Sequence, residues 1–87
     1  MKFRKKPVVV EAEQFWPDKP LPFNDRGPYV AFKDGQFYVV TAHAQSVFLA
    51  PGDWVIPEPV GPSVPSFAAY PVKPDIFAAT FEPFPSA

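Results

Sequence analysis

The sequence has no cysteine, a single histidine and no long apolar run among its 87 residues. The absence of cysteine excludes disulfides, thiolate zinc sites and cysteine nucleophiles. The apolar runs are far shorter than the roughly 18 residues that a membrane-spanning helix needs. The apolar stretch behind the first lysines, residues 8–10, is also too short for a secretory signal. We therefore expect a protein of the cytoplasm that does not interact with a membrane.

Charged residues are also scarce, and they are unevenly placed. The chain has eight Lys and Arg residues against nine Asp and Glu residues. Half of the basic residues lie within the first six positions, as Lys2, Arg4, Lys5 and Lys6. Such a cluster can bind the phosphates of nucleic acid, but no basic stripe continues through the body of the chain. We interpret it as a solvated strand end whose lysines discourage edge pairing, with nucleic-acid binding as the alternative.

No pattern in the sequence is typical of an active site or a metal site. His43 has no Asp or Glu within four residues, whereas a general base needs an orienting partner and a metal needs several ligands. Glu11 and Glu13 share one face of a predicted strand, which is the default spacing on a solvated strand. Asp53 follows a glycine in a turn, where a carboxylate commonly accepts a local backbone hydrogen bond. We expect an exposed His43, no catalysis, no metal and no cofactor.

Aromatic residues and prolines, by contrast, are abundant. The fifteen aromatic side chains (ten Phe, three Tyr, two Trp) can supply a dense core. The fourteen prolines lower the entropy of the unfolded chain wherever the native backbone accepts them. The length suits a single domain, residues 1–87. A core of this size leaves little net stability, so we also expect a homo-oligomer.

Short antiparallel strands dominate the predicted secondary structure. The pair Asp34-Gly35 between two apolar runs is typical of a type I′ hairpin, in which both central residues have positive φ. Alternating side chains predict a first strand over residues 7–15, with Phe15 at a bulge or at a buried strand end. We predict a mainly β fold, all-β or β-rich α+β, with five or six strands in a curled sheet or small open barrel. Further strand signals lie at residues 29–32, 37–41, 46–50, 54–56, 67–70 and 80–84; residues 29–56 should form a meander, and the first and last strands should be neighbours.

Proline determines the segments between the strands. Four prolines within residues 57–66 exclude a central strand there and predict an extended, polyproline-like insertion. Residues 16–28 form a predicted loop, held down by Phe23 and Leu21. Pro74 and the acidic residue after it suit the first turn of a helix, so we predict a single helical turn near Ile76.

Three segments in this order are similar to a known family. They are residues 1–12 (MKFRKKPVVVEA), 51–56 (PGDWVI) and 70–83 (YPVKPDIFAATFEP). The chain resembles a family of small uncharacterised proteins encoded by bacteriophages and by prophages in bacterial genomes. The resemblance implies a compact, mainly β protein of the bacterial cytoplasm from a phage accessory gene, and it brings no catalytic residue. Between Ile56 and Tyr70 the sequence departs from that family, where relatives tend to have a tight glycine-containing turn.

Five side chains are candidates for contact with a ligand or partner. Trp16 lies where the first strand enters its loop, Trp54 follows a turn and Tyr70 lies in a strand. Aromatic surfaces of this kind can stack on nucleobases or on proline-rich peptides. Lys73 and Asp75 flank a proline and could pair with each other, cap the short helix or contact a ligand.

These observations predict a non-enzymatic binding protein of phage or prophage origin. We expect it to engage a host protein or to sequester a small host metabolite. A nucleic-acid-binding module that uses Lys2–Lys6 is one alternative. A minor structural phage protein is another.

Overall fold

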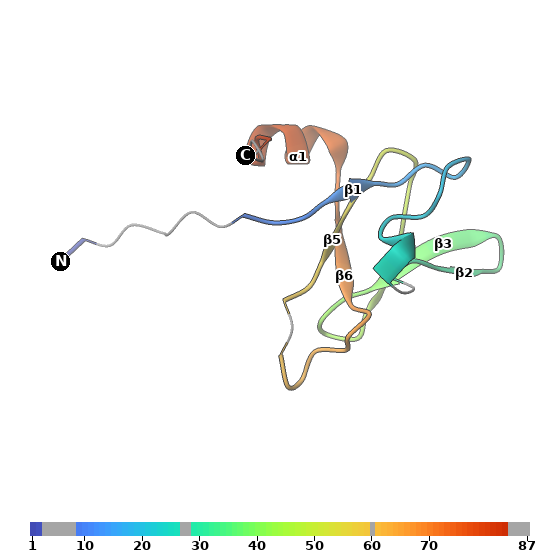
Figure 1. Cartoon of the computed structure of the whole chain (residues 1–87), viewed down its shortest axis with the longest axis horizontal. Helices are drawn as coiled ribbons and strands as arrows, with labels where there is room; N and C mark the ends of the chain where they lie inside the picture. Colours follow the sequence, from blue (N-terminus) through green and yellow to red (C-terminus); the bar gives the residue numbers. More distant parts are fainter. Residues whose placement is uncertain (3–8, 27–28, 60, 84–87) are drawn as a thin grey trace.

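The described residues fold into two small antiparallel sheets, one α-helix and a single 3-10 turn, η1 (Asn24–Arg26) (Figure 1). A computed structural model describes residues 1–2, 9–26, 29–59 and 61–83. The predicted mainly β fold is confirmed, but its six strands form two three-stranded sheets rather than one curled sheet, and the sheets do not close into a barrel. One sheet has the order β1 (Glu13–Gln14), β5 (Trp54–Pro57), β6 (Ala69–Val72), and the other has the order β2 (Ala31–Lys33), β3 (Gln36–Val40), β4 (Ser46–Phe48).

The β2–β3 hairpin follows directly from the Asp34-Gly35 turn. Both residues have positive φ, 54° and 79° respectively, as a type I′ turn requires. The register places Phe32 opposite Phe37, with ring centroids 4.7 Å apart. The predicted hairpin is confirmed.

The meander is shorter than predicted, because the chain leaves the second sheet after β4. Gly52 turns the backbone with a φ of 93°, and its N–H donates to Phe15 O at 2.8 Å. The Phe15 N–H donates in turn to Asp53 O at 2.7 Å. These two bonds join the start of β5 to the end of β1, so β5 becomes the central strand of the other sheet. The prediction of one meander over residues 29–56 is therefore wrong beyond β4.

The first strand is also shorter than predicted. β1 contains two residues, residues 9–12 are not in a strand, and residues 7–8 lie outside the described part of the chain. Glu13 lies opposite Val55. If β1 extended two residues toward the N-terminus, its next hydrogen-bonded partner on β5 would be Pro57. Proline has no N–H to donate, which explains why pairing with β5 does not continue.

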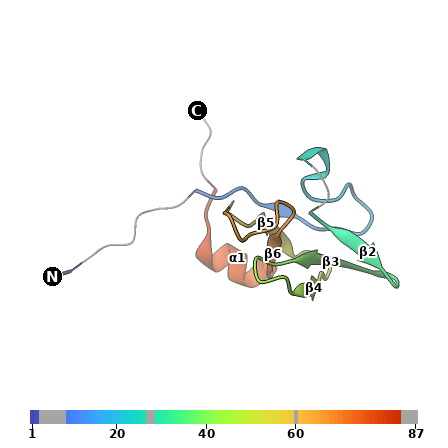
Figure 2. The same cartoon turned by 90° about the horizontal axis from the view of Figure 1, so that it is seen from below.

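The core draws side chains from both sheets, which meet where β3 contacts β6 (Figure 2). Phe15 is 1% exposed, as predicted for a buried strand end, and its ring centroid lies 5.1 Å from that of Phe37. Phe23 is 2% exposed and Leu21 packs against the same buried cluster, so both hold down the loop in its described residues 16–26. The Phe23 N–H donates to Glu13 Oε1 at 3.3 Å and ties this loop to β1. The buried cluster consists of Phe15, Phe23, Val30, Val39, Val55 and Ala69.

The proline-rich insertion folds into two turns in the part that the structure describes. Backbone hydrogen bonds of 3.1 and 3.0 Å close the turns at residues 61–64 and 65–68. Pro62 takes the second position of the first turn, where its fixed φ is favoured. The predicted extended conformation of residues 57–66 is therefore wrong there. Pro57 ends the central strand β5, a position that is possible because β1 does not reach it.

Helix α1 (Pro74–Thr80) is longer than the predicted single turn over residues 76–79. Pro74 occupies the first helical position, as predicted. The Phe81 N–H donates to Phe77 O at 2.9 Å, and the two rings stack. This i, i+4 pair stabilises the second helical turn that the sequence-based prediction left out.

The last predicted strand, over residues 80–84, does not form in its described residues 80–83. Thr80 is the last residue of α1, Phe81 caps the helix through its N–H, and residues 82–83 are irregular. The strand signal at residues 67–70 corresponds to β6, which begins two residues later and lies at a sheet edge that accommodates Pro71. β1 and β6 lie on opposite sides of β5. The prediction that the first and last strands are neighbours is therefore wrong.

Candidate functional site

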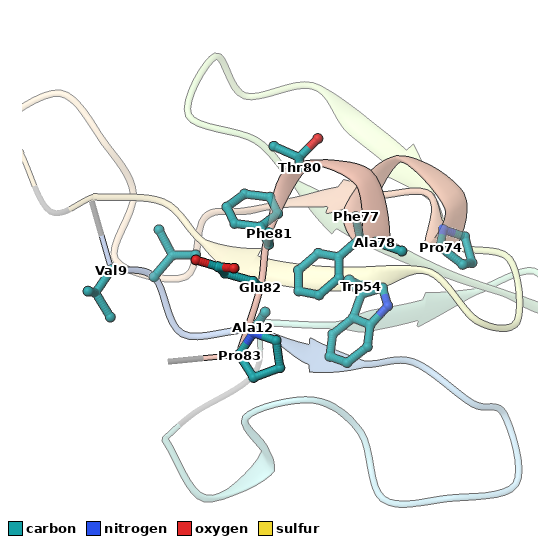
Figure 3. A pocket seen from close by; sticks show the side chains of 11 residues that line it. Val9, Ala12, Trp54, Pro74, Phe77, Ala78, Thr80, Phe81, Glu82 and Pro83 are labelled. Carbon is teal, nitrogen blue, oxygen red and sulfur yellow. The ribbon is translucent and has the colours of Figure 1, made fainter. Parts of the chain in front are cut away.

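An open apolar groove lies between α1, the start of β5 and the segment that precedes β1 (Figure 3). Its volume is about 880 Å³, within the roughly 300–1,000 Å³ of typical ligand sites. Figure 3 shows Pro74 at one end of the groove and Val9 with Glu82 at the other. None of the lining residues is fully buried, so the groove is a surface feature. The lining residues are Val9, Val10, Ala12, Trp54, Pro74, Phe77, Ala78, Thr80, Phe81, Glu82 and Pro83.

Three aromatic rings form a continuous stack along this groove. The ring centroids of Trp54 and Phe77 are 4.1 Å apart, and the ring planes differ by 7°. The centroids of Phe77 and Phe81 are 4.9 Å apart, with an interplanar angle of 28°. Aromatic pairs of this kind contribute roughly 0.5–1.5 kcal/mol beyond the burial of their area. The stack therefore couples α1 to β5 and forms one wall of the groove.

The local sequence explains why these rings meet. Trp54 is the first residue of β5 and lies opposite Val72, the last residue of β6. Only Lys73 separates β6 from α1, so the helix has to begin beside Trp54. Phe77 and Phe81 are four residues apart and therefore project from the same side of the helix. The short connection and the helical spacing together place both phenylalanines against the tryptophan.

An ion pair ties the start of α1 to the turn before β5. Asp53 is 1% exposed, and its Oδ2 accepts hydrogen bonds from the Ala50 N–H at 3.0 Å and from Lys73 Nζ at 3.1 Å. The predicted local hydrogen bond of Asp53 is confirmed. Lys73 occupies the N-cap position of α1 without making a side-chain cap. Its ammonium pairs with Asp53, so of the alternatives considered for Lys73 the structure shows neither a pair with Asp75 nor a helix cap.

Trp16 lies next to the Pro74 end of the groove. A Cβ atom at Gly52 would lie 3.3 Å from Pro74 Cγ and 3.6 Å from Trp16 Cη2. Gln14 Nε2 donates to Gly52 O at 3.0 Å and closes this corner. Trp16 is 37% exposed and is not among the lining residues, so it flanks the groove.

Tyr70 and Asp75 do not line the groove. Tyr70 is half-buried in β6, and burial, followed by the negative charge of Glu58, raises the pKa of Tyr70 above its ordinary value of 10.0. Asp75 is exposed in the first turn of α1, where a negative charge favours the helix. The five predicted candidates are thus divided: Trp54 lines the groove, Trp16 and Lys73 lie beside its Pro74 end, and Tyr70 and Asp75 lie outside it.

Glu82 carries the only charge among the described residues that line the groove. It is exposed, and its carboxylate makes no ion pair or hydrogen bond with another described residue. Glu11, by contrast, is paired with Arg26, whose hydrogen bonds and charge lower the pKa of Glu11. The groove therefore combines aromatic walls with one negative charge at its rim.

His43 is exposed in the turn between β3 and β4, as predicted. Over residues 1–2, 9–26, 29–59 and 61–83, no three His, Asp or Glu side chains lie close enough together to hold a metal ion. In the same part of the chain, no helix has the length and hydropathy needed to cross a membrane. Arg4, Lys5 and Lys6 of the predicted basic cluster lie outside the described residues.

Of the eleven residues that line the groove, sequence-based reasoning named only Trp54 as a candidate. The missed residues that determine its chemistry are Phe77, Phe81 and Glu82. The spacing of the two phenylalanines was an available signal, but the predicted helix ended before Phe81. No local signal marks Glu82, because its place at the rim depends on the approach of the segment that precedes β1.

Comparison with protein-family models, with curated proteins and with solved structures found no match to this chain. The resemblance to phage-encoded proteins therefore rests on the three sequence segments alone. All eleven lining residues of the groove fall within those segments, residues 1–12, 51–56 and 70–83.

Proposed function

We propose that this protein is a non-enzymatic binding protein of phage or prophage origin that acts in the bacterial cytoplasm and receives a segment of a host protein in its groove. The observation that carries the proposal is the Trp54–Phe77–Phe81 stack along an open apolar groove. Apolar surface that remains in contact with water on a small domain is typical of an interaction site. The three segments similar to phage-encoded proteins build this groove, which supports the same assignment.

The shape of the groove favours a polypeptide segment over a small metabolite. Sites for small molecules commonly bury about 70–90% of the ligand surface. Here none of the lining residues is fully buried, and six of the eleven are exposed. An extended segment can lie along such a surface while its outer side stays hydrated. Sequestration of a metabolite is the other outcome that the experiment below detects.

The charges near the groove favour a protein over nucleic acid. Nucleic-acid binding depends on cations that neutralise phosphates, whereas the charge that lines this groove is the carboxylate of Glu82. The proposal also includes no catalysis. Glu11 binds Arg26, and Glu13 accepts the Phe23 N–H, so these two carboxylates serve the fold.

Cross-linking from inside the groove tests this function. Ala78 lines the groove, and the adjacent Ala79 is exposed but outside the lining. We would replace each in turn by the photoreactive residue p-benzoylphenylalanine, in the full chain produced in bacteria. We expect one host protein to be cross-linked from position 78 and not from position 79. The purified host protein should then bind Ala78→Arg roughly tenfold more weakly than the wild type or Ala79→Arg.

Equal cross-linking from both positions, or cross-linking from neither, would contradict a host-protein partner in the groove. Native mass spectrometry of the gently purified wild type tests whether the groove binds a small metabolite instead. A small-molecule adduct of fixed mass that Ala78→Arg no longer retains would identify metabolite sequestration. The same spectrum measures whether the chain forms the predicted homo-oligomer.

A further inference from the structure

The carboxylate of Glu82 limits what can occupy the groove. Glu82 directly follows Phe81 and lies with Val9 at one end of the groove (Figure 3). It is exposed and makes no ion pair or hydrogen bond with another residue in the described part of the chain. Four other acidic side chains have partners: Glu11 binds Arg26, Glu13 accepts the Phe23 N–H, Asp53 binds Lys73, and Glu58 accepts the Ala42 N–H at 2.8 Å. The remaining described acidic residues, Asp18, Asp25, Asp34 and Asp75, are exposed outside the groove, so Glu82 is distinguished by its place in the lining.

An apolar ligand that fills the groove would remove part of the water around this carboxylate, on the side that faces the groove. An ionised group that loses its water without gaining a partner opposes binding, because its hydration is strongly favourable. A positive charge on the ligand replaces the lost water with an ion pair. The same apolar walls that attract a ligand therefore select one that brings a cation to the Glu82 end.

We infer that the occupant is a polypeptide segment with a lysine or arginine beside its apolar residues, the basic side chain lying across Phe81 and facing Glu82. This inference rests on the function proposed above. The aliphatic stems of Lys and Arg pack on apolar surface while their charged ends stay hydrated. A guanidinium group also stacks on an aromatic ring. Apolar residues of the segment contact the rest of the groove, toward Trp54 and Pro74.

The charge also disfavours the other segments that would fit the shape of the groove. A neutral apolar segment covers Glu82 without compensation. An acidic segment adds repulsion between like charges, which is a common means of rejecting wrong partners. Selection among random peptides therefore shows directly whether the groove prefers basic, neutral or acidic segments.

We would select random dodecapeptides by ribosome display against three full-length chains: the wild type, Glu82→Gln and Asp75→Asn. Asp75 is a matched control, because it is an exposed carboxylate of α1 outside the groove lining. We expect peptides selected by the wild type and by Asp75→Asn to share a Lys or Arg at a fixed distance from aromatic or aliphatic residues. Peptides selected by Glu82→Gln should retain the apolar residues and lose the basic one.

Fluorescence anisotropy of the strongest selected peptide then gives the size of the effect. Both partners of the pair stay near solvent, so we expect Glu82→Gln to weaken binding about two- to fivefold, and Asp75→Asn to leave it unchanged. Added salt should weaken binding to the wild type more than binding to Glu82→Gln.

Two results would separate a failure of this inference from a failure of the proposed function. Apolar peptides without a basic preference, bound by the wild type and lost on Ala78→Arg, would overturn the inference and leave the groove as a binding site. Equal effects of Glu82→Gln and Asp75→Asn would overturn it as well. Absence of any enriched peptide, or binding that Ala78→Arg does not weaken, would count against the groove itself as the site.

Discussion

Lys73 Nζ lies 3.1 Å from Asp53 Oδ2, although the Asp53 side chain is only 2% exposed and that of Lys73 is 58% exposed. Lys73 immediately precedes α1, and Asp53 immediately precedes β5. The pair therefore holds together the two elements whose aromatic side chains, Phe77 and Trp54, form the wall of the groove. The stability of the groove and the stability of the fold are linked at this point.

The substitution Lys73→Met removes the charge of this pair while it retains most of the apolar stem. The buried carboxylate of Asp53 then keeps one donor, the Ala50 N–H. We expect the free energy of unfolding to fall by about 1–2 kcal/mol. In an Asp53→Asn background the same change leaves no buried charge unpaired and should cost less than about 0.5 kcal/mol. Urea unfolding of the four chains measures both costs, and equal costs in the two backgrounds would show that the pair does not contribute.

Gly52 and Gly35 provide a matched comparison of backbone and packing. Both have positive φ, 93° and 79°, but a Cβ at Gly52 would lie 3.3 Å from Pro74 Cγ, whereas nothing lies within 4 Å of a Cβ at Gly35. Gly35→Ala should cost about 1 kcal/mol through the backbone alone. Gly52→Ala should cost about 2–3 kcal/mol, because the start of α1 must also move. The melting temperature should fall by roughly 4–8 °C per kcal/mol of lost stability, so thermal unfolding resolves the two variants. Equal losses for Gly35→Ala and Gly52→Ala would show that the contact with Pro74 adds nothing to the cost.

Tyr70 should make the stability depend on pH in the alkaline range. Burial and the charge of Glu58 raise its pKa in the folded protein above 10.0. The folded chain therefore holds the phenol proton more tightly than the unfolded chain, so this contribution is fully present below about pH 10 and is lost as the pH rises through the raised pKa. An ultraviolet absorbance titration should show one of the three tyrosines ionising after the others. Tyr70→Phe should remove that late step and reduce the loss of stability above pH 10; an unchanged loss would assign it to other groups.

Features that depend only on residues close together in the sequence were predictable from it. The Asp34-Gly35 turn formed as expected, because its φ values are set by residues that tolerate them. Asp53 accepts a hydrogen bond from a residue three positions earlier, as a turn carboxylate does. The mainly β character and the helix start at Pro74 also follow from local preferences. Each of these features involves only a few consecutive residues.

The pairing of the strands was not predictable in the same way. β4 and β5 are consecutive in the sequence, yet they belong to different sheets. The separation depends on backbone hydrogen bonds between Gly52, Asp53 and Phe15, which lie far apart in the chain. Such bonds form only when the core brings their donors and acceptors together, so turn and strand preferences do not reveal them.

The candidate site also combines features that depend on consecutive residues with features that depend on long-range contacts. The sequence by itself determined that aromatic side chains would be plentiful, that the chain would be mainly β, and that Trp54 would follow a turn at a strand start. Only the tertiary structure decided that Trp54 stacks on Phe77, that Phe81 extends the stack and that Glu82 stands at its end. The physical reason is that a groove is a property of a surface. Its walls come from three separate segments, and their side chains meet only after long-range packing has set the distances between them.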